Sequence, residues 1–346
     1  MMKKKFSWIR LTELILLLFV MIVVAITVGS ADLSVVDSLK ILLNKIPVIG
    51  DFIDVTGVAS TYETIVWNVR LPRILTAAMV GGALAVVGAT FQGVFQNSLA
   101  DPHILGVSSG AALGATIAML TGASMSFFGL GTLGIFAFIG AMITVFLVYR
   151  VAGVGGEIST TNMLLTGTAI STLLSSIISL LMTFNNDQIS KVYMWTLGSF
   201  ASATWEKAGF LAIFVAFGTI ILIMNSNKLN ILMMGEEDAC CLGIDTGKTR
   251  TLLIVVSSLL VAACVSVSGI IGFVGLIIPH CIRMVGGSDN RKLMPYAVFI
   301  GAIFLVLCDT IARTIAAPTE IPVGTITSVF GAPYFIFLVI TRKREF

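Results

Sequence analysis

The chain has 346 residues and a formal net charge of +3, and 57% of its residues are hydrophobic while only 11% are charged. Together with a mean hydropathy of +1.03, this composition excludes an ordinary soluble domain. The 46 residues of Ile104–Tyr149 include no Asp, Glu, Lys or Arg and are long enough for two crossings of about 20 residues. The apolar runs are continuous rather than alternating, which disfavours a β-barrel and indicates a polytopic helical membrane protein.

The first segment, Met1–Arg10, is basic, and the apolar run Leu11–Val28 follows it directly. Secretory signal peptides have the same arrangement. The run is long for a signal-peptide core, however, and no convincing small-residue cleavage site follows it. We therefore expect an uncleaved first membrane span.

Apolar runs along the chain predict about ten transmembrane helices, so we expect an all-α polytopic fold with residues 1–346 in a single transmembrane domain. The predicted crossings are Leu11–Val28, Ile74–Val94, Ile104–Leu120, Leu130–Tyr149, Asn162–Thr183, Gly209–Met224, Leu252–Val267, Gly272–Ile282, Pro295–Ile311 and Thr325–Thr341. Ten crossings place both termini on one side. Of the 21 lysines and arginines, fourteen fall on that side and seven on the other, which predicts cytoplasmic N and C termini.

Two segments depart from simple spanning helices. Gly272–Ile282 rises only about 16 Å as a helix, so we expect a half-length or broken helix buried among others. Asp32–Ala59, on the outer side, is long enough for a surface helix. Two sets of five crossings would be inverted relative to each other, and Pro102-His103 and Pro279-His280 at corresponding turns are a weak echo of such halves.

Three arginines stand at the predicted outer rim: Arg70 and Arg73, just before the apolar stretch that begins at Ile74, and Arg313. Arg70 and Arg73 are three residues apart, so both can face one direction on a helix or tight turn. Outer arginines run against the positive-inside tendency. They fit either docking of a carboxylate-bearing partner, because guanidinium groups bind acids bidentately, or anchoring to lipid headgroups.

A polar hinge, Gln96–Gly106, follows the second predicted crossing. After it, Gly106, Gly110 and Gly114 recur every four residues and predict close helix packing. Gly106–Gly110 also fits the G-x-S-x-G pattern of serine hydrolases. His103 lies in the hinge before the same helix, which we take as a poor position for a catalytic base, so an enzyme is disfavoured and no catalytic residue is assigned.

Asn225–Arg250 is the longest predicted inner loop. Within it, Gly235–Gly243 reads as a two-turn helix with acids in its first turn and a glycine able to form a left-handed cap. Such a helix fits a groove on another protein or the chain's own membrane domain. Gly243–Thr249 resembles a phosphate-binding loop but has three residues between its glycines instead of four, so we expect ATP coupling to come from a partner.

The predicted spans contain almost no acidic side chains, since Glu13 and Asp309 both lie near span ends. An ion-coupled secondary transporter usually needs a carboxylate near the midplane, so this alternative is disfavoured. Ser, Thr, Asn, Gln and Gly offer instead a neutral wall past which a large solute can slip. The five scattered cysteines predict buried thiols rather than disulfides or a metal site.

Three blocks together resemble the FecCD-type (vitamin B12 importer-like) permeases of ATP-binding-cassette (ABC) importers for iron-siderophores, haem and cobalamin. They run from Arg70 to Gly106, from Gly269 to Arg283, and from Asp309 and Arg313 through Glu320–Gly324 to Gly331–Pro333. The resemblance implies ten spans per subunit, a pore made by two permease subunits, two cytosolic ATPase subunits and an extracytoplasmic binding protein.

The resemblance also implies roles for individual residues. Arg70, Arg73 and Arg313 match arginines that receive acidic residues of the binding protein. The match to the cytoplasmic coupling helix (235–243) that sits in the ATPase groove covers Gly235, Glu236, Glu237, Ala239, Leu242 and Gly243. The match to the inner gate covers Ser159, Thr160 and Thr161. The match to the hinge of the transport pathway covers Asn97, Asp101, Pro102 and Pro279. Ser98 replaces the proline usual in the family, which leaves the rigidity of the hinge open.

We therefore expect the permease subunit of an ABC importer that moves a ferric siderophore across the cytoplasmic membrane of a bacterium, with haem or cobalamin as alternative cargo. No enzymatic activity, cofactor or metal is expected on this chain, because ATP and Mg²⁺ would bind to the ATPase subunits. The expected partners are a second permease subunit, the same or related, two cytosolic ATPases, the binding protein and the lipid bilayer, but no nucleic acid.

Overall fold

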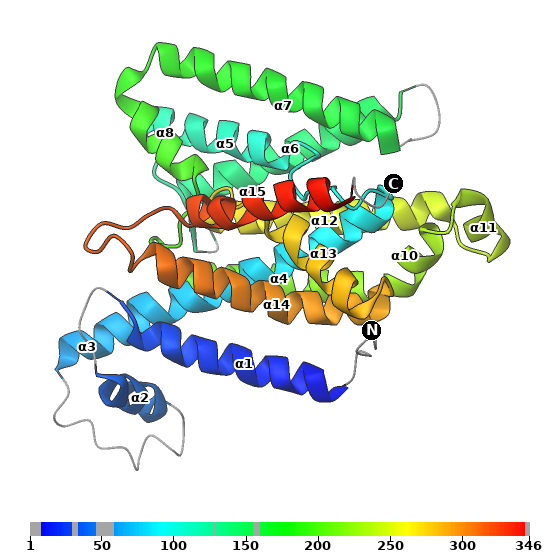
Figure 1. Ribbon diagram of the computed structural model, residues 1–346. Helices are drawn as coiled ribbons and strands as arrows, with labels where there is room; N and C mark the ends of the chain where they lie inside the picture. Colours follow the sequence, from blue (N-terminus) through cyan, green and yellow to red (C-terminus); the bar gives the residue numbers. More distant parts are fainter. Residues whose placement is uncertain (1–7, 30–33, 46–58, 128, 155–159, 343–346) are drawn as a thin grey trace.

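The computed structural model describes residues 8–29, 34–45, 59–127, 129–154 and 160–342, and in them it shows one bundle of long helices (Figure 1). Seven of the described helices are long and apolar enough to cross a membrane, and three shorter apolar helices accompany them. The strands of this part of the chain are β1 (Ser126–Phe127) and β2 (Leu130–Gly131), an antiparallel pair in which Phe127 lies opposite Leu130.

Each of the ten predicted crossings falls on one helix of the structure. These helices are α1 (Trp8–Thr27), α4 (Leu71–Val94), α5 (Val107–Thr121), α6 (Thr132–Ala152), α7 (Thr160–Thr183), α9 (Trp205–Met224), α12 (Thr246–Ser268), α13 (Val274–Gly286), α14 (Asn290–Ala312) and α15 (Val323–Arg342). The all-helical membrane fold is therefore confirmed. The number of crossings stays a prediction, because α5 and α13 are shorter than a full span.

Shorter elements form the connections: α2 (Val35–Asn44), α3 (Ser60–Thr64), the π-helical turn η2 (Ile65–Arg70), the 3₁₀ turn η3 (Asn186–Gln188), α8 (Ile189–Thr196), α10 (Ser226–Leu232) and α11 (Glu236–Cys241). Helix α2 confirms the expected surface helix at its beginning, where the Ser34 side chain accepts a hydrogen bond from Val36 N. Residues 46–58 of that predicted segment lie outside the described residues.

The arrangement of helix ends separates two sides of the bundle. Helix α1 begins and α15 ends at the end that carries α10 and α11, whereas α2, α3 and the connection from α14 to α15 lie at the opposite end (Figure 1). This agrees with the prediction that both termini lie on one side of the membrane. Which side is cytoplasmic remains a prediction from the distribution of basic residues.

Glycine contacts bring the central helices close together. Helix α4 is almost entirely buried, and a Cβ at its Gly88 would overlap the backbone of Gly275 in α13. The predicted small-residue face of α5 is confirmed, because a Cβ at Gly110 or Gly114 would overlap the backbone of α6. Close backbone approach of this kind supplies packing energy where lipid removes the hydrophobic drive.

The region around Arg70 and Arg73 corrects the prediction that these residues precede a helix. The helical path is continuous over Ser60–Val94, and Leu71 N donates to Val66 O across the π-helical turn η2. Pro72 lies directly after this turn. A regular α-helix would press the proline ring against a carbonyl one turn earlier, so the wider π-turn lets the helix pass through the proline.

The short helix α13 confirms the predicted half-length element, and Pro279 lies inside it. Pro102 lies instead in the loop between α4 and α5. The two Pro-His pairs therefore do not occupy corresponding turns, and the echo that suggested inverted halves is wrong. A match of two residues does not define the backbone conformation around them. Proline occurs in loops, and it also occurs inside a helix, where one backbone hydrogen bond is then lost.

Candidate functional sites at the two ends of the bundle

The three predicted arginines meet at the end of the bundle opposite α11. Arg73, in the first turn of α4, places Nη2 2.9 Å from Asp309 Oδ1 and Nη1 2.9 Å from Glu320 Oε1. Arg313, the residue that follows α14, has its Nε 3.9 Å from Asp309 Oδ2. The structure thus brings together arginines that are 240 positions apart in the sequence around one buried carboxylate.

Helix α1 completes this arginine cluster (Arg70, Arg73 and Arg313). Arg70 Nη1 donates to the carbonyls of Ile26 at 2.6 Å and Thr27 at 3.2 Å, and Arg313 Nη2 donates to Ala25 O. The last carbonyls of a helix have no partner within the helix, so these guanidinium groups satisfy them.

All three arginines are buried, with exposed fractions of 5% for Arg70, 7% for Arg73 and 5% for Arg313. The sequence located them correctly at one end of the bundle, but it did not show that their guanidinium groups already hold carbonyls and acids of the same chain. Arg73 pairs with both Asp309 and Glu320, and Arg313 lies near Asp309. Three arginines therefore stand against two acids, and this set of five side chains carries a net positive charge that an acidic surface would complement.

The predicted helix at the opposite end is α11, and its capping is confirmed. Gly235 precedes it at φ 130° and Gly243 follows it at φ 78°, conformations that favour glycine. Ile244 N donates to Ala239 O at 3.1 Å and Gly243 N to Cys240 O at 2.9 Å, which is the pairing of a Schellman cap. Ala239 is fully buried and anchors the helix, whereas Leu242 is 59% exposed and Glu237 is exposed.

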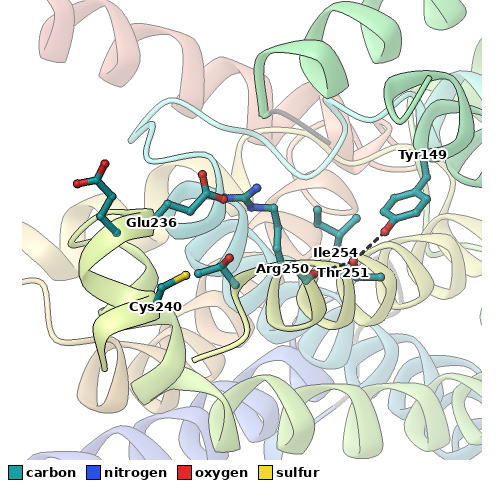
Figure 2. Close-up of a pocket in the computed structure, with 9 residues that line it drawn as sticks. Tyr149, Glu236, Cys240, Arg250, Thr251 and Ile254 are labelled. Atoms are coloured by element: carbon teal, nitrogen blue, oxygen red, sulfur yellow. Dashed lines mark hydrogen bonds and ion pairs between the residues drawn. The ribbon is translucent and has the colours of Figure 1, made fainter. Parts of the chain in front are cut away.

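A cavity of about 580 Å³ lies between α11 and the ends of α6 and α12 (Figure 2). Arg250 of α12 reaches Glu236 of α11 with an Nη2–Oε1 distance of 2.6 Å, and the hydroxyls of Tyr149 and Thr251 are 2.7 Å apart. These contacts tie α11 to α12 and α6 to α12. The cavity is lined by Tyr149, Glu236, Glu237, Cys240, Thr246, Gly247, Arg250, Thr251 and Ile254.

The glycine-containing stretch between α11 and α12 forms helix caps. Gly243 ends α11, and the Asp245 side chain begins α12 by accepting from Lys248 N at 2.9 Å. This backbone N–H, together with the Lys248 ammonium, holds the pKa of the Asp245 carboxyl below its usual value. Helix α12 starts at Thr246 rather than the predicted Leu252, because the cap and not the hydropathy sets the first turn.

The predicted hinge packs against the first turn of α13. Asp101 Oδ1 accepts from His103 N at 2.8 Å, and Pro102 is buried against Gly275. Asn97, also predicted to belong to the hinge, is exposed, and its side chain accepts from Leu99 N at 2.9 Å. Of the other predicted hinge residues, Pro102 therefore contacts the helix that contains Pro279, α13.

His103 corrects one step of the sequence argument. Its Nε2 is 2.9 Å from Ile271 O, and its Nδ1 forms a hydrogen bond with the Ser108 hydroxyl. A carbonyl only accepts, so Nε2 carries the proton and Nδ1 accepts from Ser108. The expectation that His103 is poorly placed to reach this serine is wrong. A serine hydrolase directs the donor nitrogen at a carboxylate, whereas here a backbone carbonyl occupies that position.

Gln92 of α4 is a site residue that sequence reasoning missed. Its Nε2 lies 3.3 Å from Gly275 O and 3.2 Å from Leu276 O in the first turn of α13, and its Oε1 accepts from Arg283 Nη1. Pro279 has no N–H to give to the carbonyl of Gly275 four residues earlier. Gln92 supplies that donor, and only the presence of a proline inside α13 could have hinted at the need for one.

Helix α7 begins at two of the predicted gate residues, Thr160 and Thr161, while Ser159 lies outside the described residues. A second missed feature is the hydroxyl stripe of α7, spaced at three to four residues on one exposed face: Thr168, Thr172, Ser176, Ser179 and Thr183. Each of these hydroxyls donates to the carbonyl four residues earlier at 2.9–3.0 Å. The spacing was present in the sequence and could have identified the stripe.

These features define a polytopic membrane protein of the transport-permease class, with a charged cluster at one end and an exposed capped helix at the other. A family model described as the FecCD transport family matches residues 16–341. The chain belongs to this family and is a permease subunit of an ABC importer. In such importers the ATPase activity lies in partner subunits.

Individual relatives support the same assignment. The chain is 43% identical to the cobalamin import system permease of Halobacterium salinarum over 84% of this chain and 76% of that protein. It is 39% identical to the hemin transport system permease of Yersinia pestis, over 81% and 84% of the two chains. The molybdate import system permease of Haemophilus influenzae is 37% identical over 96% and 95%.

Among solved structures, the chain is similar to a metal-chelate type ABC transporter in an inward-facing conformation. The TM-score is 0.80 at 34% sequence identity, and the match covers 96% of this chain and 98% of the other. The similarity therefore extends over the whole bundle.

Proposed function

We propose that this chain is the permease subunit through which an ATP-driven importer moves an organic metal chelate, a ferric siderophore, across the cytoplasmic membrane of a bacterium. In this proposal it works with a second permease subunit, two cytosolic ATPases and an extracytoplasmic binding protein. Haem and cobalamin are the alternative cargoes, since relatives with 39% and 43% identity are named for hemin and cobalamin import.

The observation that carries the proposal is the exposed, doubly capped helix α11. It projects from one end of the bundle (Figure 1), and Ala239 holds it on its own chain while Glu237 and Leu242 face outward. A six-residue helix fixed by glycines at both ends, with an exposed leucine, is suited to a groove on a partner protein. We assign that groove to the ATPase subunit.

The opposite end supports a second docking site. The net positive charge of the arginine cluster suits acidic residues of a binding protein, which would compete with the α1 carbonyls for Arg70 and Arg313. Arg73 is held by two acids of its own chain. We infer that Arg73 keeps the cluster assembled while Arg70 and Arg313 are the residues that exchange partners.

The hydroxyl stripe of α7 supports the pathway. Since each hydroxyl proton is already donated within the helix, the exposed oxygens offer only acceptor lone pairs to a passing solute. Such a surface is neutral and binds weakly, so a large chelate can pass without being trapped. We place the inner gate of this pathway at Ser159, Thr160 and Thr161, and its hinge at the loop that contains Asp101 and Pro102.

The test is transport in reconstituted vesicles. The chain is placed in proteoliposomes with its ATPase and loaded binding protein, and uptake of a ferric siderophore is compared with that of haem and cobalamin. We expect uptake that requires ATP inside and the binding protein outside, with the siderophore moved fastest. Faster uptake of cobalamin or haem would reassign the cargo and leave the importer assignment intact.

The same vesicles separate the competing class of protein. An ion-coupled secondary transporter would use a proton or sodium gradient to drive uptake of its solute, with no ATPase subunit present. Gradient-driven uptake by the chain alone would therefore contradict the proposal.

A further inference from the structure

Helix α10 (Ser226–Leu232) lies directly before α11 in the chain. Only Met233, Met234 and Gly235 separate the two helices, and Gly235 adopts φ 130°. A displacement of α11 is passed on to α10, because a connection of three residues can take up only a small part of the movement. What α10 contacts therefore decides which membrane helices respond.

Asn230 of α10 contacts the beginning of α14. Its Nδ2 donates to Asp289 Oδ1 at 2.8 Å, and its Oδ1 accepts from both Asn290 N and Asn290 Nδ2 at 2.9 Å. Asn290 is fully buried, so the two bonds that it donates to Asn230 are partly shielded from water. One amide thus uses its donor and its acceptor on two consecutive residues of another helix.

The contact takes the place of a missing part of the helix cap. The first N–H groups of a helix have no acceptor within the helix. At α14, the Asp289 side chain accepts from Arg291 N at 3.1 Å, and Asn230 supplies the acceptor for the N–H of Asn290. Hydrogen bonds from Arg291 and Asn230 lower the pKa of Asp289, which keeps this carboxylate ionised as the acceptor for the Asn230 amide.

Helix α10 is also held by the end of α4. Leu229 is fully buried, and a Cβ at Gly93 would come within 2.7 Å of its Cδ1. Gln96, which adopts φ 48°, donates from Nε2 to Leu232 O at 3.0 Å. Helix α10 therefore lies between the last turn of α4 and the first turn of α14.

We propose that Asn230 is the positioning residue through which movement of α11 is passed to α14, and that without its amide the ATPase still docks but turns over without moving cargo. This inference rests on the proposed role of α11 as the ATPase contact. It assigns to a residue of α10, outside the predicted coupling segment, the task of linking that segment to the membrane helices.

The test compares Asn230→Ala with Asn225→Ala in the complete reconstituted importer. Asn225 lies between α9 and α10 and is half-buried like Asn230. Its Nδ2 donates to Ile221 O of α9 at 2.8 Å rather than to α14. The measurement is cargo transported per ATP hydrolysed. For Asn230→Ala we expect this ratio to fall about tenfold, as for the loss of one or two net hydrogen bonds, while basal ATP hydrolysis and ATPase attachment stay at the wild-type level.

A second pair of variants tests the geometry itself. Asn230→Asp alone should uncouple the importer as well, because two carboxylates would then face each other. Combining it with Asp289→Asn restores a donor opposite the new acceptor, and we expect the ratio of cargo to ATP to recover. If Asn230→Ala does not fold, this double variant decides, since continued uncoupling there would overturn the inference.

An unchanged cargo-to-ATP ratio in Asn230→Ala, equal to that of Asn225→Ala, would overturn the role of Asn230 directly. Failure of the proposed function looks different. In that case the wild-type chain would not retain the ATPase subunit at all, whatever stands at position 230.

Discussion

Gln92 shows how a single side chain can replace a backbone donor in another helix. Pro279 leaves the carbonyl of Gly275 without its helical donor, and the Gln92 amide of α4 approaches that carbonyl instead. Its oxygen also accepts from Arg283, so both ends of one amide are used in the buried contact between α4 and α13. The helix α13 is therefore held in shape partly by its neighbour.

This account predicts an interaction between two substitutions. Gln92→Leu should lower the free energy of unfolding by about 1–3 kcal/mol, because it leaves buried polar groups without partners. In a Pro279→Ala background the backbone regains its own donor, so Gln92→Leu should cost less there. Thermal unfolding of the four proteins measures the difference, and Thr90→Val serves as control because its hydroxyl donates only to Val86 O of α4. Simply additive losses would show that the two residues act independently.

At the scale of elements, the sequence predicts what depends on local pattern. All ten apolar segments lie on helices, the short α13 was expected, and α11 ends at the predicted left-handed glycine, Gly243. Helix starts were less accurate: α14 begins at Asn290, not Pro295, because hydropathy marks the lipid-facing part whereas Asp289 caps the helix earlier. The π-turn before Pro72 differs from an α-helix in its hydrogen bonds and not in its hydropathy, so the apolar pattern did not reveal it.

The sequence could not predict contacts between distant segments. Arg73 lies 236 positions from Asp309 and 247 from Glu320, and no periodicity connects them. Burial of the arginine cluster follows from these contacts and from the α1 carbonyls. Asn230 was hidden for the same reason, since its partners lie about 60 positions further along in α14. Residue type and spacing predict where a residue lies along a helix. To identify its hydrogen-bond partner in a distant segment, the tertiary fold must be known.

The exposed faces of α7 and α9 lead to a prediction for these elements. The hydroxyl stripe of α7 suits a water-filled pathway, whereas Phe217 of α9 is 67% exposed on an apolar face that suits lipid. In a chain whose five cysteines are replaced by alanine, Ser176→Cys should react with a charged thiol reagent in vesicles and Phe217→Cys should not. A thiol needs water to ionise, so labelling rates distinguish the two environments. Equal labelling at both positions would remove α7 from the pathway.

The whole molecule separates its two predicted docking sites by the length of the bundle. The arginine cluster joins α1, α4 and α14 at one end, and α10 and α11 join α4, α12 and α14 at the other. Helices α4 and α14 take part at both ends and pack against each other along their length (Figure 1). These two helices connect the two ends of the bundle mechanically. The side chains that form one site are nevertheless different from those that form the other.

Because the sites use different side chains, weakening one should leave the other intact. Replacing Arg70 and Arg313 together by glutamine removes two positive charges but keeps amide donors for the α1 carbonyls, so the fold should survive. We expect the binding protein to bind at least about tenfold more weakly, as for the loss of one or two charge-assisted hydrogen bonds. ATPase attachment should be unchanged. Surface binding measurements and co-purification give the two values, with Lys191→Gln as control, an exposed cation of α8 at the same end. If the double variant folds and binds the binding protein as tightly as the wild type, these arginines have no role in docking and serve only to hold α1 in place.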